Sequence, residues 1–391
     1  MNCTVVKSVK SGSIKAIPSK SAAHRLMIAA GLSGHSLEGL CEGLSVDITA
    51  TKECIDALMG DGEVKKMPCR ESGSTLRFLI PVTAALGVRG EFMAEGRLPY
   101  RPMTALKEQL ESHGCRMSSE GENPVWVDGK LESGIYVLPG NISSQYVTGL
   151  LMALPMCDGD SEIQIDGILQ SRPYVDMTLD VLKKSGIVIE ESENTFKIAG
   201  NQKYNLARSY VEDVEGDWSN AAFWLVMDAI SEGNIECTGL DKNSAQGDKA
   251  IADWLYIVNT DEEVNIDVGD IPDLVPILSV LASARKKGAV TNIVNAERLR
   301  YKESDRLKAV TEVMNGLGAD IEENFDSLKI KGVERLKGGQ ADSYNDHRIA
   351  MMAAAAACIS DGGIEIIGCE AVNKSYPAFF EHYKLLGGEV I

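Results

Sequence analysis

The sequence predicts an α/β fold built from two similar domains, and an internal repeat is the main observation behind this prediction. Six segments share one design: a small or polar start, an apolar stretch of helical length, a Gly-containing turn and a β-branched strand. The segments begin at Ser21, Ser74, Ser144, Ser219, Asp273 and Asp346. Their starts are separated by 53 and 70 residues in the first half of the chain and by 54 and 73 in the second half. The fifth segment fits least well, since Asn replaces its final Gly. This spacing indicates a three-unit domain that has been duplicated.

A second type of helix, amphipathic and followed by a turn and a short strand, alternates with the apolar type. It is expected within residues 55–67, 103–117, 175–189, 250–264, 306–321 and 379–390. In LKEQLESHGCRM, LDVLKKSGIVI, VTEVMNGLGADI and FFEHYKLLGGEVI, a Gly stands where a left-handed helix C-cap is favoured. Each unit therefore combines one helix that should be buried with one helix that should cover a sheet.

Composition excludes several classes of protein. The chain has 391 residues, of which 44% are hydrophobic and 25% charged, as in ordinary globular proteins. Its net charge of −18 argues against a surface for duplex DNA, RNA or an anionic membrane, because such surfaces need a positive face. A small anionic substrate is compatible with this charge.

The nine cysteines are scattered, and no two of them form a C-x-x-C pair. This pattern indicates neither a disulfide framework nor a zinc site, so we expect reduced thiols and a cytoplasmic location. The N-terminal sequence has no apolar segment of signal-peptide length, and the longest apolar run is about half of what a membrane-spanning helix needs. We expect a protein that is neither exported nor bound to a membrane.

The starts of the apolar helices are candidate anion-binding positions. A helix N-terminus presents unpaired N–H groups and partial positive charge, so several such ends meeting at one cleft would bind anions. The residues at these starts are Lys20 and Ser21, Ser72 to Ser74, Ser143 to Gln145, Asp217 to Ser219, Asp273, and Asn345 to Arg348. For any single Ser, Asp or Asn, helix capping is the simpler role. Capping does not explain the cations Lys20, Arg25, Arg77 and Arg348 near the same starts.

Further cations lie in dense, short contexts around Arg101, Arg172 and Lys374 and in the run from Arg300 to Arg306. In that run, Lys302 with Asp305 or Glu303 with Arg306 has the spacing of an ordinary surface ion pair on a helix. The run alone leaves the structural and functional interpretations equally open.

Nine collinear motifs resemble those of the 5-enolpyruvylshikimate-3-phosphate synthase family: PSKSAAHR, SGSTLR, YRPM, GNISSQYVTGLLMALP, SRPYVDMT, DIPDLVPILSVLA, LRYKESDRL, YNDHRIAMM and NKSYPAFF. The resemblance runs from about residue 18 to residue 380. It implies an inside-out α/β barrel architecture, in which two domains each contain three βαβαββ-type units with buried parallel helices. The implied domains are residues 1–15 with 216–391 and residues 16–215, with the active site in the cleft between them.

The family transfers the enolpyruvyl group of phosphoenolpyruvate to the 5-hydroxyl of shikimate 3-phosphate and releases phosphate, in the pathway to chorismate and the aromatic amino acids. The resemblance implies that shikimate 3-phosphate meets Lys20, Ser21, Arg25, Ser143, Ser144, Gln145, Ser171, Tyr174, Asp273 and Lys302. It implies that phosphoenolpyruvate meets Lys20, Gly73, Arg101, Gln145, Arg306, Arg348 and Lys374.

The resemblance also implies catalytic roles for Asp273 as base, for Glu303 as proton donor to carbon and for Lys20 as an assisting group. No metal or other cofactor is implied, because Lys and Arg supply the positive charge. We expect a monomer. Where many family members read Asn-Ala-Gly-Thr, this chain reads Glu71-Ser72-Gly73-Ser74, which puts a carboxylate beside the expected phosphoenolpyruvate site.

The sequence disfavours two other functions. The sister enzymes that transfer enolpyruvyl to UDP-N-acetylglucosamine usually carry a Cys in the loop before their Arg-Pro, and here the loop from Ala94 to Tyr100 has none. RNA terminal-phosphate cyclases are built from similar units, but the acidic charge and the lack of a basic stripe with aromatic residues disfavour RNA binding.

Overall fold

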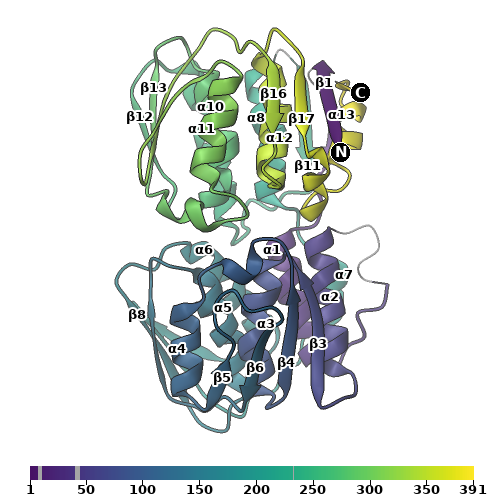
Figure 1. Cartoon of the computed structure of the whole chain (residues 1–391), viewed down its shortest axis with the longest axis vertical. Helices are drawn as coiled ribbons and strands as arrows, with labels where there is room; N and C mark the ends of the chain where they lie inside the picture. Colours follow the sequence, from purple (N-terminus) through teal and green to yellow (C-terminus); the bar gives the residue numbers. More distant parts are fainter. Residues whose placement is uncertain (8–10, 40–44, 232) are drawn as a thin grey trace. The chain divides into compact units, whose positions relative to one another are not determined.

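The computed structural model describes residues 1–7, 11–39, 45–231 and 233–391, which form two compact units (Figure 1). Unit 1 comprises Met1–Ser19 and Glu215–Ile391, and unit 2 comprises Lys20–Val214. Both units combine helices with mixed sheets, so the predicted α/β class is confirmed. Cys41 and the end of the first repeat segment at Leu40 lie outside the described residues.

Unit 2 contains the helices α1 to α7 and the strands β3 to β10. The helices are α1 (Lys20–Leu32), α2 (Val46–Met59), α3 (Gly73–Ala85), α4 (Thr104–Ser112), α5 (Ser144–Ala153), α6 (Arg172–Lys184) and α7 (Ser209–Glu212). The strands are β3 (Val64–Arg70), β4 (Arg89–Ala94), β5 (Cys115–Met117), β6 (Val125–Gly129), β7 (Ile135–Pro139), β8 (Ser161–Asp166), β9 (Ile189–Ser192) and β10 (Thr195–Ile198).

Unit 1 contains the remaining elements. The α-helices are α8 (Trp218–Ile230), α9 (Ile251–Trp254), α10 (Val275–Ser283), α11 (Arg306–Gly316), α12 (His347–Ala356) and α13 (Phe379–Leu385). The strands are β1 (Asn2–Lys7), β2 (Ser11–Lys15), β11 (Asn234–Thr238), β12 (Val264–Asp267), β13 (Val290–Val294), β14 (Asp320–Glu323), β15 (Leu328–Lys331), β16 (Gly339–Asp342), β17 (Ile364–Ile367) and β18 (Glu389–Val390). Short 3₁₀ helices that matter below are η5 (Pro272–Leu274), η6 (Glu297–Tyr301) and η8 (Cys369–Lys374).

One sheet pattern recurs in both units. In the sheets β3-β4-β6-β5, β7-β8-β10-β9 and β12-β13-β15-β14, the first two strands are parallel and the other two pairings are antiparallel. An apolar helix connects the parallel pair in each case, and an amphipathic helix precedes the hairpin. This is the βαβαββ unit.

The fourth sheet reaches the same pattern by a different route. Its order is β16-β17-β1-β18, so the N-terminal strand β1 occupies the position that the last strand of the unit has in the other sheets. The two remaining βαβαββ-type units are shorter. Strands β2 and β11 form a two-stranded parallel sheet in unit 1, and α1 and α2 have no sheet of their own among the described residues of unit 2.

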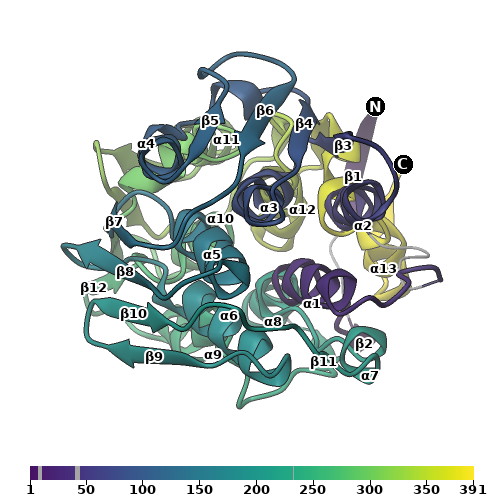
Figure 2. The ribbon, with the colours of Figure 1, turned by 90° about the horizontal axis from the view of Figure 1, so that it is seen from below.

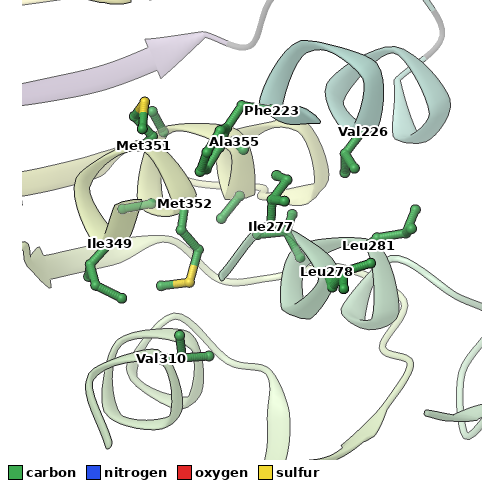
Figure 3. Packing of buried hydrophobic residues seen from close by; sticks show 14 of the residues in the cluster. Phe223, Val226, Ile277, Leu278, Leu281, Val310, Ile349, Met351, Met352 and Ala355 are labelled. Carbon is green, nitrogen blue, oxygen red and sulfur yellow. The ribbon is translucent and has the colours of Figure 1, made fainter. Parts of the chain in front are cut away.

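The six apolar helices of the repeat are α1, α3, α5, α8, α10 and α12, and each is buried along most of its length. In unit 2, the sheets β3-β4-β6-β5 and β7-β8-β10-β9 lie at the periphery, with α3 and α5 on their inner side, as Figure 2 shows. In unit 1, α8, α10 and α12 pack on one another through side chains such as Phe223, Ile277 and Met351 (Figure 3). The sheets are therefore on the outside and the apolar helices form the core.

The predicted helix ends agree with the structure at four glycines, and the predictions disagree with it at two helices. Gly114, Gly186, Gly318 and Gly387 all have positive φ just after a helix, which confirms the predicted left-handed C-caps. The helix expected within residues 55–67 was placed too late, because α2 begins at Val46 and residues 64–67 belong to β3. The short α9 likewise replaces most of the long helix expected at 250–264.

Close packing of α3 against α5 depends on Gly149. A Cβ atom at this position would lie 2.5 Å from the backbone oxygen of Arg77 and 3.0 Å from Cγ of Pro81. We predict that Gly149→Ala lowers the free energy of unfolding by about 1 to 3 kcal/mol, because the two helices must separate to admit the methyl group. Chemical denaturation measures this. Gly316→Ala is the matched control: this helical glycine has open space around it, so the change should be neutral or stabilising by up to about 1 kcal/mol. Equal effects of the two variants would contradict the packing argument.

Candidate functional site

The centre of the candidate site in unit 1 is the buried guanidinium of Arg306, the first residue of α11. Its side chain is 1% exposed and contacts three carboxylates. Nε donates to Asp346 at 2.9 Å, Nη1 donates to Asp273 at 2.8 Å and Nη2 donates to Glu303 at 2.7 Å. Burial by itself lowers the pKa of Arg306, but the carboxylates, Asp346 foremost, raise it above its ordinary value. Arg306 is therefore a permanent cation that fixes three acidic side chains.

Asp273, in η5 at the start of α10, is the meeting point of three cations. Besides Arg306, it contacts Arg348 Nη2 at 3.1 Å and Lys302 Nζ at 3.5 Å. The three positive charges stabilise the ionised carboxylate. Burial lowers the pKa of Lys302 below its ordinary value, although Asp273 opposes this; Arg306 lowers it further. With Glu303 and Asp346 on Arg306, the cluster combines three cations with three carboxylates.

Helix capping brings these groups to their places. Asp346 is the N-cap of α12 and accepts from the backbone N–H of Arg348 at 2.9 Å, while its other oxygen holds Arg306. Arg348 Nη2 also donates to Ser219 Oγ at 2.9 Å, on the first turn of α8. Lys374, at the end of η8, donates to the carbonyl of Asn345 at 2.8 Å. Capping is thus confirmed for Asp346, which in addition holds Arg306.

In the run from Arg300 to Arg306, one of the two expected ion pairs forms. Glu303 and Arg306 make the i,i+3 pair, whereas Lys302 turns to Asp273 and Asp305 pairs with Arg300 at 3.2 Å. Asp305 also caps α11 by accepting from the backbone N–H of Lys308. The run is not a solvated surface face, because two of its cations, Lys302 and Arg306, reach Asp273 in the buried cluster.

A second cluster, in unit 2, surrounds Arg25 on α1. Its guanidinium is 2% exposed, and Nε donates to Thr178 Oγ1 at 2.9 Å, Nη1 to the carbonyl of Ser21 at 2.6 Å and Nη2 to the carbonyl of Tyr174 at 2.9 Å. Thr148 Oγ1 lies 3.5 Å from Nη2. Burial lowers the pKa of Arg25 to about 10. The protein itself thus occupies several of the donors of Arg25, a residue expected to meet shikimate 3-phosphate.

A third cluster, also in unit 2, lies at the start of α3. A Cβ atom at Gly73 would lie 2.7 Å from Nη1 of Arg101 and 2.9 Å from Nη1 of Arg77, so two guanidinium groups approach the bare Cα. Arg77 Nη1 donates to Oε1 of Gln145 at 3.0 Å, and Gln145 Nε2 donates to Ser74 Oγ at 3.0 Å. Two cations, an amide and a helix N-terminus therefore come together here.

The other expected residues of unit 2 have local structural roles. Ser143 caps α5 through the backbone N–H of Gln145, and Ser144 is buried. Ser171 is buried in the left-handed conformation before α6. Arg172, next to it, forms ion pairs with Asp176 and Glu191, so this cation is largely committed to the protein.

Sequence reasoning missed Asp47, which lies 2.9 Å from Lys20 Nζ and is nearly buried in the first turn of α2. An acidic residue in a first helical turn is a recognisable signal, but α2 was placed too late for it to be seen. Thr148 and Thr178, which hold Arg25, carry no sequence signal because threonines on helices are common. The carboxylate of Glu71 lies beside Gly96. Its Oε2 atom is 2.7 Å from the position that a Cβ atom at Gly96 would take.

Chemically, the described residues supply cations, carboxylates and helix N-termini that suit small, multiply charged anions. Among them, no group of three or more His, Cys, Asp or Glu side chains is placed to hold a metal ion. The eight described cysteines all have free thiols. None of the helices in the described part of the chain is long and apolar enough to cross a membrane.

Comparisons with known proteins agree on one family. The family model described as EPSP synthase (3-phosphoshikimate 1-carboxyvinyltransferase) matches residues 6–383. A 3-phosphoshikimate 1-carboxyvinyltransferase of Clostridium kluyveri is 43% identical, covering 97% of this chain and 96% of the relative. One from Clostridium acetobutylicum is 42% identical, covering 100% and 98%.

Solved structures support the same fold. EPSP synthase from Acinetobacter baumannii superposes with a TM-score of 0.77 at 22% identity, covering 100% of this chain and 99% of that one. The enolpyruvyl transferase NikO from Streptomyces tendae gives a TM-score of 0.75 at 14% identity, with 100% and 98% covered. At nearly full coverage and above 40% sequence identity to curated members, the chain belongs to the EPSP synthase family of 3-phosphoshikimate 1-carboxyvinyltransferases.

Proposed function

We propose that the three clusters form one active site in a cleft between the two units, and that the units are the two domains of the enzyme. The site transfers the enolpyruvyl group of phosphoenolpyruvate to the 5-hydroxyl of shikimate 3-phosphate and releases phosphate. The observation that carries this proposal is the arrangement around Arg306, where Asp273 and Glu303 are held by one buried guanidinium with Lys302 and Arg348 beside them. It provides two carboxylates for proton transfer and several cations for anionic substrates.

Each substrate has a proposed set of contacts. Shikimate 3-phosphate binds Lys20, Ser21, Arg25, Ser143, Ser144, Gln145, Ser171, Tyr174, Asp273 and Lys302. Phosphoenolpyruvate binds Lys20, Gly73, Arg101, Gln145, Arg306, Arg348 and Lys374. In support of the second set, Gly73, Arg101 and Gln145 already lie together, and Arg306 and Arg348 share Asp273 as a partner.

The first chemical step is an addition. Asp273 accepts the proton of the 5-hydroxyl as the oxygen attacks C2 of phosphoenolpyruvate, and Glu303 gives a proton to C3. The product is a tetrahedral intermediate that still carries the phosphate. Lys20 assists by stabilising the phosphate oxygens. The second step is an elimination: the Glu303 carboxylate takes a proton from C3, the C2–O bond to phosphate breaks with its electron pair going to the phosphate, and Asp273 returns its proton to the leaving phosphate.

Glu303 needs a proton to act as donor, yet it is paired with Arg306 at 2.7 Å. An ion pair favours the ionised carboxylate. When the anionic groups of phosphoenolpyruvate engage Arg306, they compete with Glu303 for the guanidinium, and a carboxyl group beside an anion takes up a proton more readily. Binding of this substrate therefore prepares the acid that the addition requires.

The substrate assignment predicts strict dependence on both substrates. Purified protein should release inorganic phosphate only when shikimate 3-phosphate and phosphoenolpyruvate are both present, which a colorimetric phosphate assay measures. Each substrate alone is the control. Phosphate release with UDP-N-acetylglucosamine in place of shikimate 3-phosphate would overturn the assignment.

The proton-transfer roles predict large losses of turnover. Glu303→Gln and Asp273→Ala should each lower kcat by roughly 10²-fold or more, as removal of a positioned acid or base usually does. Glu334→Gln, at an exposed ion pair with Lys287, should leave kcat unchanged. Steady-state kinetics at saturating substrates decides this, and near-normal turnover in either site variant would show that the roles are wrong.

The lowered pKa of Lys302 predicts an alkaline limit. The ammonium form is the one that pairs with a phosphate, and burial lowers the pKa of Lys302 below its ordinary value of 10.5. The value of kcat/KM for shikimate 3-phosphate should therefore fall as the pH rises, with a midpoint below 10.5. Lys302→Arg keeps its charge, so its alkaline limb should move to higher pH. A limb that does not move in this variant would assign it to another group.

A cytoplasmic location and a monomeric state are part of the proposal. The free thiols of the described cysteines support the first.

A further inference from the structure

A chain of buried hydrogen bonds crosses three helices of unit 2 and has no part in the mechanism above. His24 Nδ1 on α1 lies 2.6 Å from Thr51 Oγ1 on α2, and Thr51 Oγ1 lies 2.5 Å from Thr75 Oγ1 on α3. The Thr75 hydroxyl donates to Ser72 Oγ at 2.6 Å. All four side chains are at most 1% exposed. The chain ends at Ser72, which caps α3 directly before Gly73.

The direction of the protons follows from the number of donors. Because the single Thr75 hydroxyl proton goes to Ser72, the proton between the two threonines must come from Thr51. Thr51 can then only accept from His24, so His24 carries its proton on Nδ1. The carbonyl of Asp47, 3.3 Å from Thr51 Oγ1, is the weaker acceptor of the same proton.

His24 is suited to donate one hydrogen bond while its ring stays neutral. Burial lowers its pKa well below the ordinary value, and the charges of Lys20 and Arg25 lower it further. The neutral ring leaves a lone pair on Nε2, and this buried atom has no hydrogen-bond partner among the described residues. Phe78 of α3 contacts the ring edge-on, with centroids 6.5 Å apart. The ring is therefore held between α1 and α3 with Nδ1 toward Thr51.

The chain of hydrogen bonds fixes the first turn of α3. Ser72 Oγ accepts from both the hydroxyl and the backbone N–H of Thr75, so its position is set from inside the core. The next residue, Gly73, is the one that Arg101 and Arg77 approach. In unit 1, by contrast, apolar side chains such as Phe223, Ile277 and Met352 fill the space between the apolar helices (Figure 3). A polar chain is thus not a general requirement for packing these helices.

We propose that His24 is a positioning residue for phosphoenolpyruvate binding: through Thr51 and Thr75 it fixes Ser72 and hence the backbone of Gly73 against Arg101. This inference rests on the proposed assignment of Gly73 and Arg101 to phosphoenolpyruvate. It adds residues that touch neither substrate and act only through the start of α3.

The test is a set of variants with the shape of threonine but no hydroxyl group. Thr51→Val and Thr75→Val should each raise KM for phosphoenolpyruvate by about fivefold or more, the effect of one lost hydrogen bond, with KM for shikimate 3-phosphate within about twofold. The double variant should be no worse than the poorer single variant, since either change breaks the same chain. Steady-state kinetics with each substrate varied in turn gives the values.

The matched control is Thr83→Val. Thr83 is on the same helix, is fully buried, and its hydroxyl has no partner among the described residues, so both KM values should stay at those of the unmodified enzyme. A second pair of variants covers the case in which a valine variant does not fold. His24→Asn retains a nitrogen donor near the position of Nδ1 and should keep the low KM for phosphoenolpyruvate, whereas His24→Leu should lose it.

Several outcomes would overturn the proposal. One is a KM for phosphoenolpyruvate that stays unchanged while only the melting temperature falls, and another is an equal rise of both KM values. Arg101→Ala separates this inference from the assignment on which it rests. If this variant leaves KM for phosphoenolpyruvate unchanged, the assignment is wrong; if it raises KM and Thr75→Val does not, only the role of His24 is wrong.

Discussion

The buried ion pair between Arg306 and Asp346 is the interaction on which the rest of the candidate site depends. Its two members are 1% and 0% exposed, and burying two charges is favourable only when their geometry and further hydrogen bonds compensate for lost hydration. Both conditions are met, because Asp346 also caps α12 and accepts from Ser304 at 3.0 Å. The pair therefore ties α11 to α12. Arg306 on α11 holds Glu303 and Asp273, and Arg348 on α12 also contacts Asp273.

In each unit, cations among the candidate site residues are neutralised by nearby carboxylates. Lys20 is paired with Asp47, and Arg306 and Arg348 share Asp273. A phosphate that enters must compete with these carboxylates, so net affinity is a difference between two sets of ion pairs. Removing an internal carboxylate therefore has two opposing effects, since it frees a cation for the ligand but leaves that cation unpaired before binding. The local placement of the cations, and not the net charge of the protein, governs these contacts. The protein can therefore be acidic as a whole.

Repetition made the fold predictable. The apolar helices, their paired spacing and the four glycine C-caps could be read from local patterns, because burial and left-handed backbone leave direct traces in the sequence. The start of α2 at Val46 was missed although Ser45 before it and Asp47 in its first turn are typical of a helix start. The completion of the fourth sheet by β1 was not predictable, because it joins residues from opposite ends of the sequence. For the site, the cations were found from their motifs. Their internal partners, Asp47 and Thr178, were missed because they lie far away in the sequence and have ordinary local contexts.

The strand β1 has a consequence for how the protein is made. Unit 2 is one continuous segment, so all of its strands and helices have been synthesised once residue 214 has left the ribosome. Unit 1 cannot complete its β16-β17-β1-β18 sheet at that stage, because β1 pairs with β17 and β18 near the other end of the chain. During translation, β1 therefore remains an unpaired strand edge while the whole of unit 2 is made, and unit 1 closes last.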